Sequence, residues 1–155
     1  MIRVLLLFLF MPLVVEANDD CNNPVQSAKY FFEKHQNFYF QKPPEALLTP
    51  KFFKAVSNEI KCLEEKGMCA LDYAPWIGAN DGKIGNPITF KLSGDLSLSG
   101  QAIVKMEYPF ELYPNTTLKI QTVQIVLTKN VEGCWKVDDL ITPLGDSLAK
   151  LFSDE

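Results

Sequence analysis

The chain has 155 residues, with 15 lysines and arginines against 19 aspartates and glutamates and a net charge of −4. Nucleic acids select basic surfaces, and the basic residues here are scattered, so the composition argues against a nucleic-acid-binding protein. A chain of this length can bury a substantial core, so disulfides would supplement the packing and would not replace it.

Residues 1–17 have the layout of a cleavable signal peptide. Arg3 supplies a positive start, an apolar stretch covers Val4 to Val15, and Ala17 ends the small-residue motif that a signal peptidase reads. The apolar stretch is shorter than the roughly 20 residues of a membrane-spanning helix. We therefore predict a periplasmic or secreted protein, with a single mature domain over residues 18–155 and no membrane span after cleavage.

Four cysteines follow the predicted signal peptide: Cys21, Cys62, Cys69 and Cys134. An even number of cysteines in an oxidising compartment predicts two disulfides. Two pairings are open: Cys62 with Cys69 and Cys21 with Cys134, or Cys21 with Cys62 and Cys69 with Cys134. There is no CxxC pair and His35 is the one histidine, so the spacing does not suit zinc. We expect no metal site and no cofactor.

Two helices are predicted in the first half of the mature chain. Asn23-Pro24 combines a capping side chain with proline at the first helical position, and apolar residues at helical spacing continue to about Gln36. Thr49-Pro50 repeats this start signal, and Gly67 stands where a left-handed residue would end the second helix.

Residues 68–86 differ from what precedes and follows them, because they show no periodicity and yet contain large apolar side chains. A loop of this length is uncommon unless it has a function or packs as a lid. We predict a binding loop formed by Asp72, Tyr73, Trp76 and Asp81. Asp72 and Asp81 either approach each other, which would raise the pKa of one of them, or accept backbone N–H groups in a tight turn.

After Pro87 the apolar residues alternate, which predicts strands over residues 88–92, 102–112, 118–128 and 134–141. Pro109 falls within the longest strand and predicts a sheet edge or a bulge there. Gly145-Asp146 is expected to cap a short C-terminal helix. Helices followed by a strand meander predict an α+β fold, with two N-terminal helices on a curved antiparallel sheet of about four strands. Such a cone resembles nuclear-transport-factor-like and cystatin-like proteins.

Two stretches resemble the bacterial YbjP/YqhG family of exported proteins of unknown function. The first is Leu71-Asp72-Tyr73-Ala74-Pro75 with Asn80-Asp81, where the family has Leu-Asp-Tyr-Asp-Pro and Gln-Asp. The second is Trp135-Lys136-Val137-Asp138-Asp139-Leu140, followed by Gly145-Asp146-Ser147-Leu148. Ala74 and Asn80 depart from the family pattern, which weakens any shared carboxylate site. The resemblance implies export and this fold, and it implies no reaction.

A second candidate site is a pocket that holds His35 and Asp139. His35 lies on the apolar side of the first helix, and the sequence names no partner for it as a general base. Asp138 and Asp139 are adjacent in a strand, so we expect them to point to opposite faces, with at most one in a pocket. The aromatic residues near Phe38 and Phe40 belong either to the core or to an exposed binding patch.

These observations favour a non-enzymatic, monomeric binding protein of the cell envelope. Its partner would be an envelope protein or a small apolar ligand, held at the cone mouth or at residues 68–86, and an inhibitor or immunity role fits this description. The alternative is a small enzyme with a carboxylate-containing pocket in the cone interior, in which Asp72, Asp81 or Asp139 and Tyr73 would act as acid–base groups.

Overall fold

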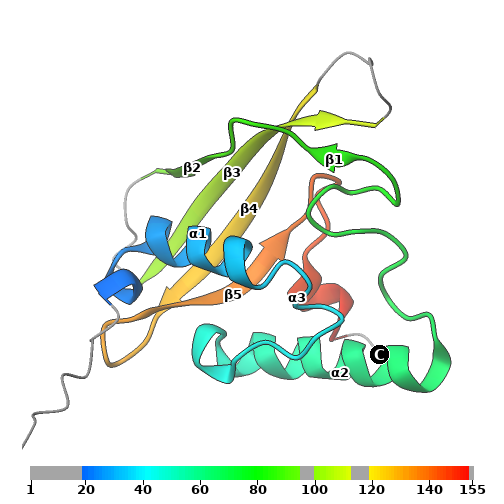
Figure 1. Cartoon of the computed structure of the whole chain (residues 1–155). Helices are drawn as coiled ribbons and strands as arrows, with labels where there is room; N and C mark the ends of the chain where they lie inside the picture. The colour runs from blue at the N-terminus through cyan, green and yellow to red at the C-terminus, as the bar shows by residue number, and fades with distance from the viewer. Residues whose placement is uncertain (1–18, 95–99, 113–118, 154–155) are drawn as a thin grey trace, which may run out of the picture.

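The computed structural model describes residues 19–94, 100–112 and 119–153; the predicted signal peptide lies outside these residues. The predicted α+β class is confirmed: two N-terminal helices pack with a strongly curled antiparallel sheet, and a short helix follows the last strand (Figure 1). Within the described residues, no helix is long and apolar enough to cross a membrane.

Both long helices begin where their capping residues predict, and α2 also ends at its predicted glycine. Helix α1 spans Pro24–Lys34, and the side chain of Asn23 accepts hydrogen bonds from two backbone N–H groups of its first turn. Helix α2 spans Pro50–Lys66, with Thr49 as its N-cap. Gly67 ends α2 with a φ of 77°, a backbone conformation that costs glycine little because it has no Cβ atom.

The sheet has five strands in the order β1-β3-β4-β5, and β2 also pairs with β3. Strands β3, β4 and β5 form an antiparallel meander, while β1 and β2 pair in succession along the other side of β3. The two-residue strand β1 was not predicted. The strands are β1 (Lys83–Ile84), β2 (Thr89–Leu92), β3 (Gln101–Glu111), β4 (Lys119–Lys129) and β5 (Trp135–Ile141).

Pro109 lies within the interior strand β3, and the predicted edge is present only locally, because β1 and β2 leave β3 unpaired at Pro109 on one side. Strand β3 pairs continuously with β4 through Pro109, which stands opposite Ile120. On the other side of β3, residues 85–88 connect β1 to β2 at this point. The carbonyl of Pro109 accepts a hydrogen bond there from the N–H of Gly85. The missing N–H of proline is tolerated because no strand pairs with β3 at this point on that side.

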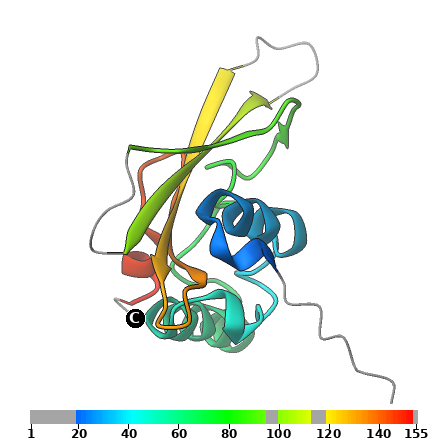
Figure 2. The ribbon, with the colours of Figure 1, turned by 90° about the vertical axis from the view of Figure 1, so that its left-hand side faces the viewer.

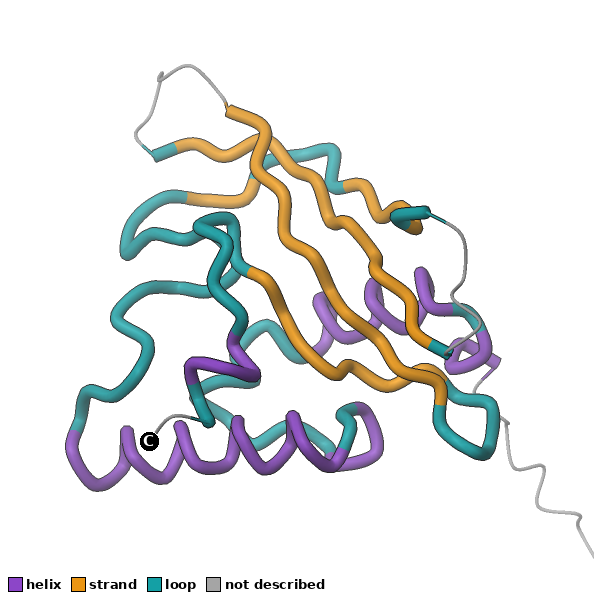
Figure 3. The backbone as a smooth tube through the Cα atoms, turned by 180° about the vertical axis from the view of Figure 1, so that it is seen from behind, coloured by secondary structure: helices purple, strands orange, loops and turns teal. Residues whose placement is uncertain are grey.

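The helices cover different parts of the sheet. Helix α1 crosses one face and contacts β2, β3, β4 and β5, whereas α2 lies at the end of the sheet against β5 and the short helix α3 (Leu148–Leu151) (Figures 1 and 3). Two short 3₁₀ segments, η1 (Asp19–Asn22) and η2 (Glu45–Leu47), precede α1 and α2. Helix α3 is capped by Ser147 and not by Gly145-Asp146, because Ser147 Oγ accepts from the N–H of Lys150.

The inside of the curled sheet is filled by side chains. The fully buried residues come mainly from α1, the segment after it, α2, strands β3 to β5 and α3; they include Phe31, Phe38, Phe52, Val104, Met106, Tyr108, Ile125, Leu127, Leu140 and Leu148. These large apolar side chains supply most of the burial that stabilises the domain.

The structure contains two disulfides, and it selects one of the two pairings left open by the sequence. Cys21 is bonded to Cys134, and Cys62 is bonded to Cys69. The first bond ties the segment before α1 to the start of β5, and the second closes a short loop at the end of α2. Two disulfides are typical of proteins from oxidising compartments.

Candidate binding site

Residues 68–86 are held firmly against the rest of the domain, and Trp76 is the main reason. Its side chain is 5% exposed, and its ring lies 5.0 Å from that of Phe32 and 5.9 Å from that of Phe38. Its Nε1–H group donates a 2.8 Å hydrogen bond to the carbonyl of Gln36. Trp76 therefore packs within the core, and little of its side chain is exposed.

The sheet provides a second attachment for the same loop. The hydroxyl group of Tyr108, on β3, donates to the carbonyl of Trp76 and is also within 3.0 Å of Oε1 of Gln121. Tyr108 is buried, and this burial raises the pKa of its hydroxyl well above the usual value. These contacts attach the middle of the loop to the sheet.

Tyr73 joins the loop to the segment between β5 and α3. Its hydroxyl donates to Oδ2 of Asp146 and lies 3.4 Å from Oγ1 of Thr142. Desolvation, assisted by the hydrogen bond to Asp146, raises the pKa of Tyr73 to about 12. Tyr73 thus ties the loop over residues 68–86 to the segment that follows β5.

This raised pKa predicts a specific loss of stability in alkali. The pKa of Tyr73 is higher in the folded than in the unfolded protein, so its stabilising contribution is complete below pH 10 and lost as the pH rises to about 12. The free energy of unfolding of the wild type and of Tyr73→Phe would be measured in urea at several pH values between 10 and about 12. The difference between the two proteins should decrease as the pH rises. Tyr30→Phe, which removes a hydroxyl from α1, is the control. A difference that is constant with pH would contradict the assignment.

The two carboxylates predicted for the loop do not meet in one pocket. Asp72 and Asp81 are both exposed. Asp72 lines the surface groove described below, together with Tyr73, and Asp81 is outside that lining. The turn around Ala74 and Ala79, which form an isolated bridge, keeps the intervening residues compact.

His35 and Asp139 line different pockets of the domain. His35 caps the C-terminus of α1, its ring lies 6.0 Å from that of Tyr30 and 6.2 Å from that of Phe31, and partial burial lowers its pKa below 6.5. Asp139 lines a different hollow, next to Lys51 and Lys150.

The side chains of Asp138 and Asp139 project from the same face of β5, whereas simple alternation along the strand would place them on opposite faces. The register against β4 shifts between Val126 and Leu127, which makes Asp138 an extra residue in β5, a β-bulge. Val137 and Leu140, three positions apart, are consequently both buried. The two carboxylates line one hollow on the outside of the sheet.

Both carboxylates accept hydrogen bonds from residues at the N-terminus of a helix. Asp138 accepts a 2.6 Å hydrogen bond from Oγ1 of Thr49, the N-cap of α2. Asp139 accepts from Oγ of Ser147, the N-cap of α3, at 2.5 Å and from the N–H of Ala149 at 2.8 Å. The adjacent acidic pair thus fixes two helices to β5, and these bonds account for both side chains without a ligand.

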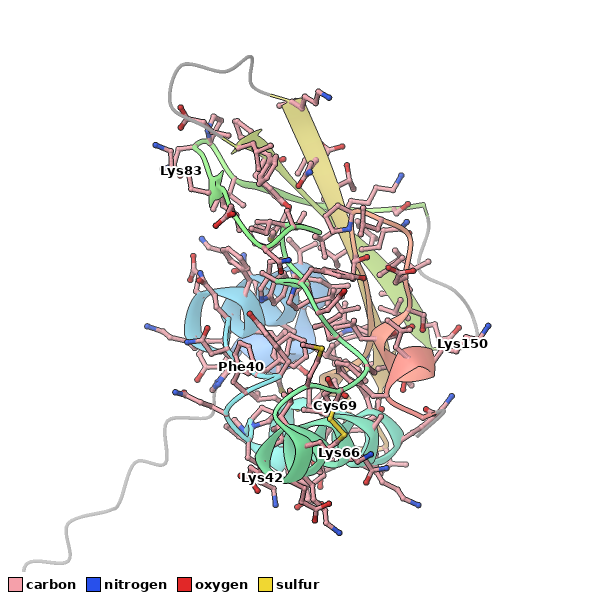
Figure 4. The ribbon with its side chains drawn as sticks, turned by 90° about the vertical axis from the view of Figure 1, so that its right-hand side faces the viewer. Phe40, Lys42, Lys66, Cys69, Lys83 and Lys150 are labelled. Atoms are coloured by element: carbon pink, nitrogen blue, oxygen red, sulfur yellow. A yellow bond between two sulfur atoms is a disulfide. The ribbon has the colours of Figure 1, made fainter. Side chains whose placement is uncertain are left out.

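An exposed apolar groove lies between the end of α2, the turn after α1 and the loop over residues 68–86. We call it the Phe40–Met68 groove; its volume is about 410 Å³, and its walls include Phe40, Leu63, Met68, Leu71, Asp72 and Tyr73. Phe40 is 60% exposed and Met68 is 72% exposed. In Figure 4, Phe40 and Cys69, the neighbour of Met68, lie on the same side of the molecule, above α2.

The floor of the Phe40–Met68 groove contains a residue that sequence reasoning missed. Glu59 is 1% exposed, and its carboxylate accepts hydrogen bonds from the N–H groups of Ala70 and Leu71. It therefore holds the beginning of the loop against α2. A signal was present in the sequence, because Glu59 lies three residues after Val56 and four before Leu63, on the apolar face of the helix.

Among the described residues, no three or more His, Cys, Asp and Glu side chains form a cluster that could hold a metal ion. Comparisons of the chain with models of known protein families, with curated proteins and with solved structures found no match.

Proposed function

We propose that the chain is a periplasmic or secreted binding protein without enzymatic activity, and that it docks a partner protein of the envelope on the Phe40–Met68 groove. The observation that carries this proposal is the exposure of two large apolar side chains, Phe40 and Met68, on the same groove. The export that it requires agrees with the signal-peptide pattern and with the resemblance to the YbjP/YqhG family.

The groove has the properties that protein-docking surfaces share. Contiguous exposed apolar residues on a small protein commonly mark interaction sites, and methionine adapts its shape to a partner. The groove is also preformed, because Glu59 and Trp76 anchor the loop that forms one of its walls. A preformed surface loses little conformational entropy on binding.

The chemistry of the groove indicates what would occupy it. Phe40 and Met68 offer contacts to apolar side chains, and the exposed carboxylate of Asp72 at the rim favours a basic residue beside them. We therefore expect an apolar segment with an adjacent lysine or arginine as the docking element. An inhibitor or immunity protein would use such a surface to cover a site on its target.

The test is site-specific photocrosslinking in the producing cells. A photoreactive amino acid placed at position 40 or at position 68 should capture the same protein. The matched control is position 131, in the turn between β4 and β5, because Val131 is fully exposed and lies outside the groove. Capture of that protein equally well from position 131, or from neither groove position, would contradict the proposal.

Affinity measurements with the captured protein complete the test. Phe40→Ser and Met68→Ser should each weaken binding by about tenfold or more, as is usual for central apolar contacts. Asp72→Lys should weaken it as well, while Val131→Ser should leave it unchanged. Wild-type affinity in both serine variants would exclude the groove as the docking surface.

A further inference from the structure

Two of the four methionines, Met68 and Met106, follow the predicted signal peptide, and their surroundings are opposite. Met68 is largely exposed on the wall of the Phe40–Met68 groove, whereas Met106 is fully buried in β3. Helix α1 contacts β3, and Figure 2 shows α1 packed beside the sheet. One thioether is therefore open to small molecules in solution, and the other is enclosed by the core.

The exposure of Met68 is fixed by the backbone on both sides of it. Gly67, the residue before it, ends α2 in a left-handed conformation. Cys69, the residue after it, is bonded to Cys62 on α2, and the loop beyond is held by the carboxylate of Glu59. The folded protein thus presents the sulfur atom of Met68 at its surface, and no unfolding of the helix end is needed to expose it.

No thiol competes with Met68 for an oxidant. All four cysteines of the chain are in disulfides. A disulfide holds no thiolate, which is the form of cysteine that oxidants attack most readily. The thioether of an exposed methionine is the next oxidisable sulfur, and the product is the sulfoxide. In the folded protein the first sulfur that a peroxide can oxidise is therefore that of Met68.

We propose that Met68 is a modification site, at which oxidation by a peroxide closes the Phe40–Met68 groove to its partner. A lone pair of the sulfur atom attacks one oxygen of the peroxide, and an S–O bond forms as the O–O bond breaks. The other oxygen leaves with the peroxide proton as water, or as an alcohol from an organic hydroperoxide. The sulfur loses two electrons, and the peroxide gains them.

The sulfoxide changes the chemistry of the groove wall. Oxidation converts a flexible apolar side chain into a polar one, whose oxygen accepts hydrogen bonds. Water satisfies this oxygen in the free protein, because position 68 is exposed. An apolar segment docked on the groove would displace that water, and a polar atom buried without a partner weakens binding. This consequence rests on the proposed docking function, whereas the oxidation itself does not.

The oxidation is tested on the protein alone, with hydrogen peroxide as the reagent and peptide mass spectrometry as the readout. In the folded protein, Met68 should gain one oxygen atom at least about ten times faster than Met106, because Met106 reacts only when the sheet opens. In concentrated urea the two rates should become similar. Protein oxidised at Met68 alone should unfold in urea at the same midpoint as untreated protein. Equal rates in the folded protein, or a faster reaction of Met106, would overturn the assignment.

The effect on docking is measured with the partner captured by photocrosslinking, added after the peroxide has been removed. Oxidation of Met68 should weaken its binding by about tenfold or more, the effect of one polar atom left without a partner. Met68→Leu keeps an apolar side chain and has no sulfur, so it should bind the partner and keep its affinity after the same treatment. Met106→Leu, an exchange that cores tolerate, is the matched control and should lose affinity as the wild type does.

The outcomes separate this inference from the proposed function. Unchanged affinity after complete oxidation of Met68 would leave the groove as the docking surface and refute its control by oxidation. A loss of affinity in treated Met68→Leu would show that another residue is responsible. If neither position 40 nor position 68 captures a partner, the docking function fails, and the two oxidation rates still decide whether Met68 is the modified residue.

Discussion

Replacing Cys21 and Cys134 together with alanine is expected to lower the free energy of unfolding by about 4 to 5 kcal/mol. The two residues are 113 positions apart in the sequence, so their bond constrains nearly the whole unfolded chain. In the chain-entropy account, a bond that closes a loop of about 100 residues stabilises the folded state by about 4.7 kcal/mol. Urea unfolding monitored by tryptophan fluorescence would measure the loss.

The second disulfide provides the matched comparison. Cys62 and Cys69 are 7 positions apart, and alanine at both is expected to cost about 2 to 3 kcal/mol because the loop is short. Two cysteines are removed in each variant, so the difference isolates the effect of loop length. Equal losses, or a larger loss for the short loop, would contradict the expectation. Peptide mapping of the intact protein should recover the same two pairs, and a peptide that links Cys21 to Cys62 would refute the pairing.

Trp76→Ala is expected to destabilise the domain by about 3 to 5 kcal/mol, the usual range when a buried tryptophan is truncated. The ring of Trp76 packs against those of Phe32 and Phe38, and the cavity left behind can collapse only in part. Trp76→Phe should destabilise the domain less, because it keeps an aromatic ring in the core. Its remaining cost comes from the smaller ring and from the lost hydrogen bond to Gln36. Chemical denaturation followed by far-ultraviolet circular dichroism is the measurement, because it does not depend on tryptophan.

Phe40→Ala is the control for this experiment. Phe40 belongs to the same group of aromatic side chains, with its ring 4.2 Å from that of Tyr39, but it is 60% exposed. We expect a loss of about 1 kcal/mol or less. Similar losses for Trp76→Ala and Phe40→Ala would mean that Trp76 is not a core residue. A large loss for Phe40→Ala would also weaken the proposal that Phe40 is held exposed for binding.

The elements that the sequence predicted well depend on local interactions. The starts of both long helices follow from one capping side chain and the proline after it, and the end of α2 follows from a glycine at φ 77°. The long strands follow from alternation of apolar residues, which places one face of each strand against the core. In each case the signal lies within a few residues of the feature it specifies.

The sequence was less informative about residues whose surroundings depend on distant partners. Trp76 was predicted as part of a binding loop, and side chains from α1 and the segment after it bury its ring. Asp139 lines a hollow that does not include His35, and it accepts a hydrogen bond from Ser147 at the start of α3. Pro109 was predicted to mark an edge or a bulge, and it lies in an interior strand where two short neighbouring strands leave a local edge.

The sequence alone was sufficient for the α+β class, for the helices and for the longer strands, because capping and periodicity act over one or two turns of chain. Only the tertiary structure shows that Cys134 is the partner of Cys21 and that Glu59 is buried beneath residues 68–86. It also shows that Tyr30 and Trp135 line the same cavity. Each of these depends on how α1 and α2 pack against β5, and such contacts between distant segments leave no periodic pattern in the chain.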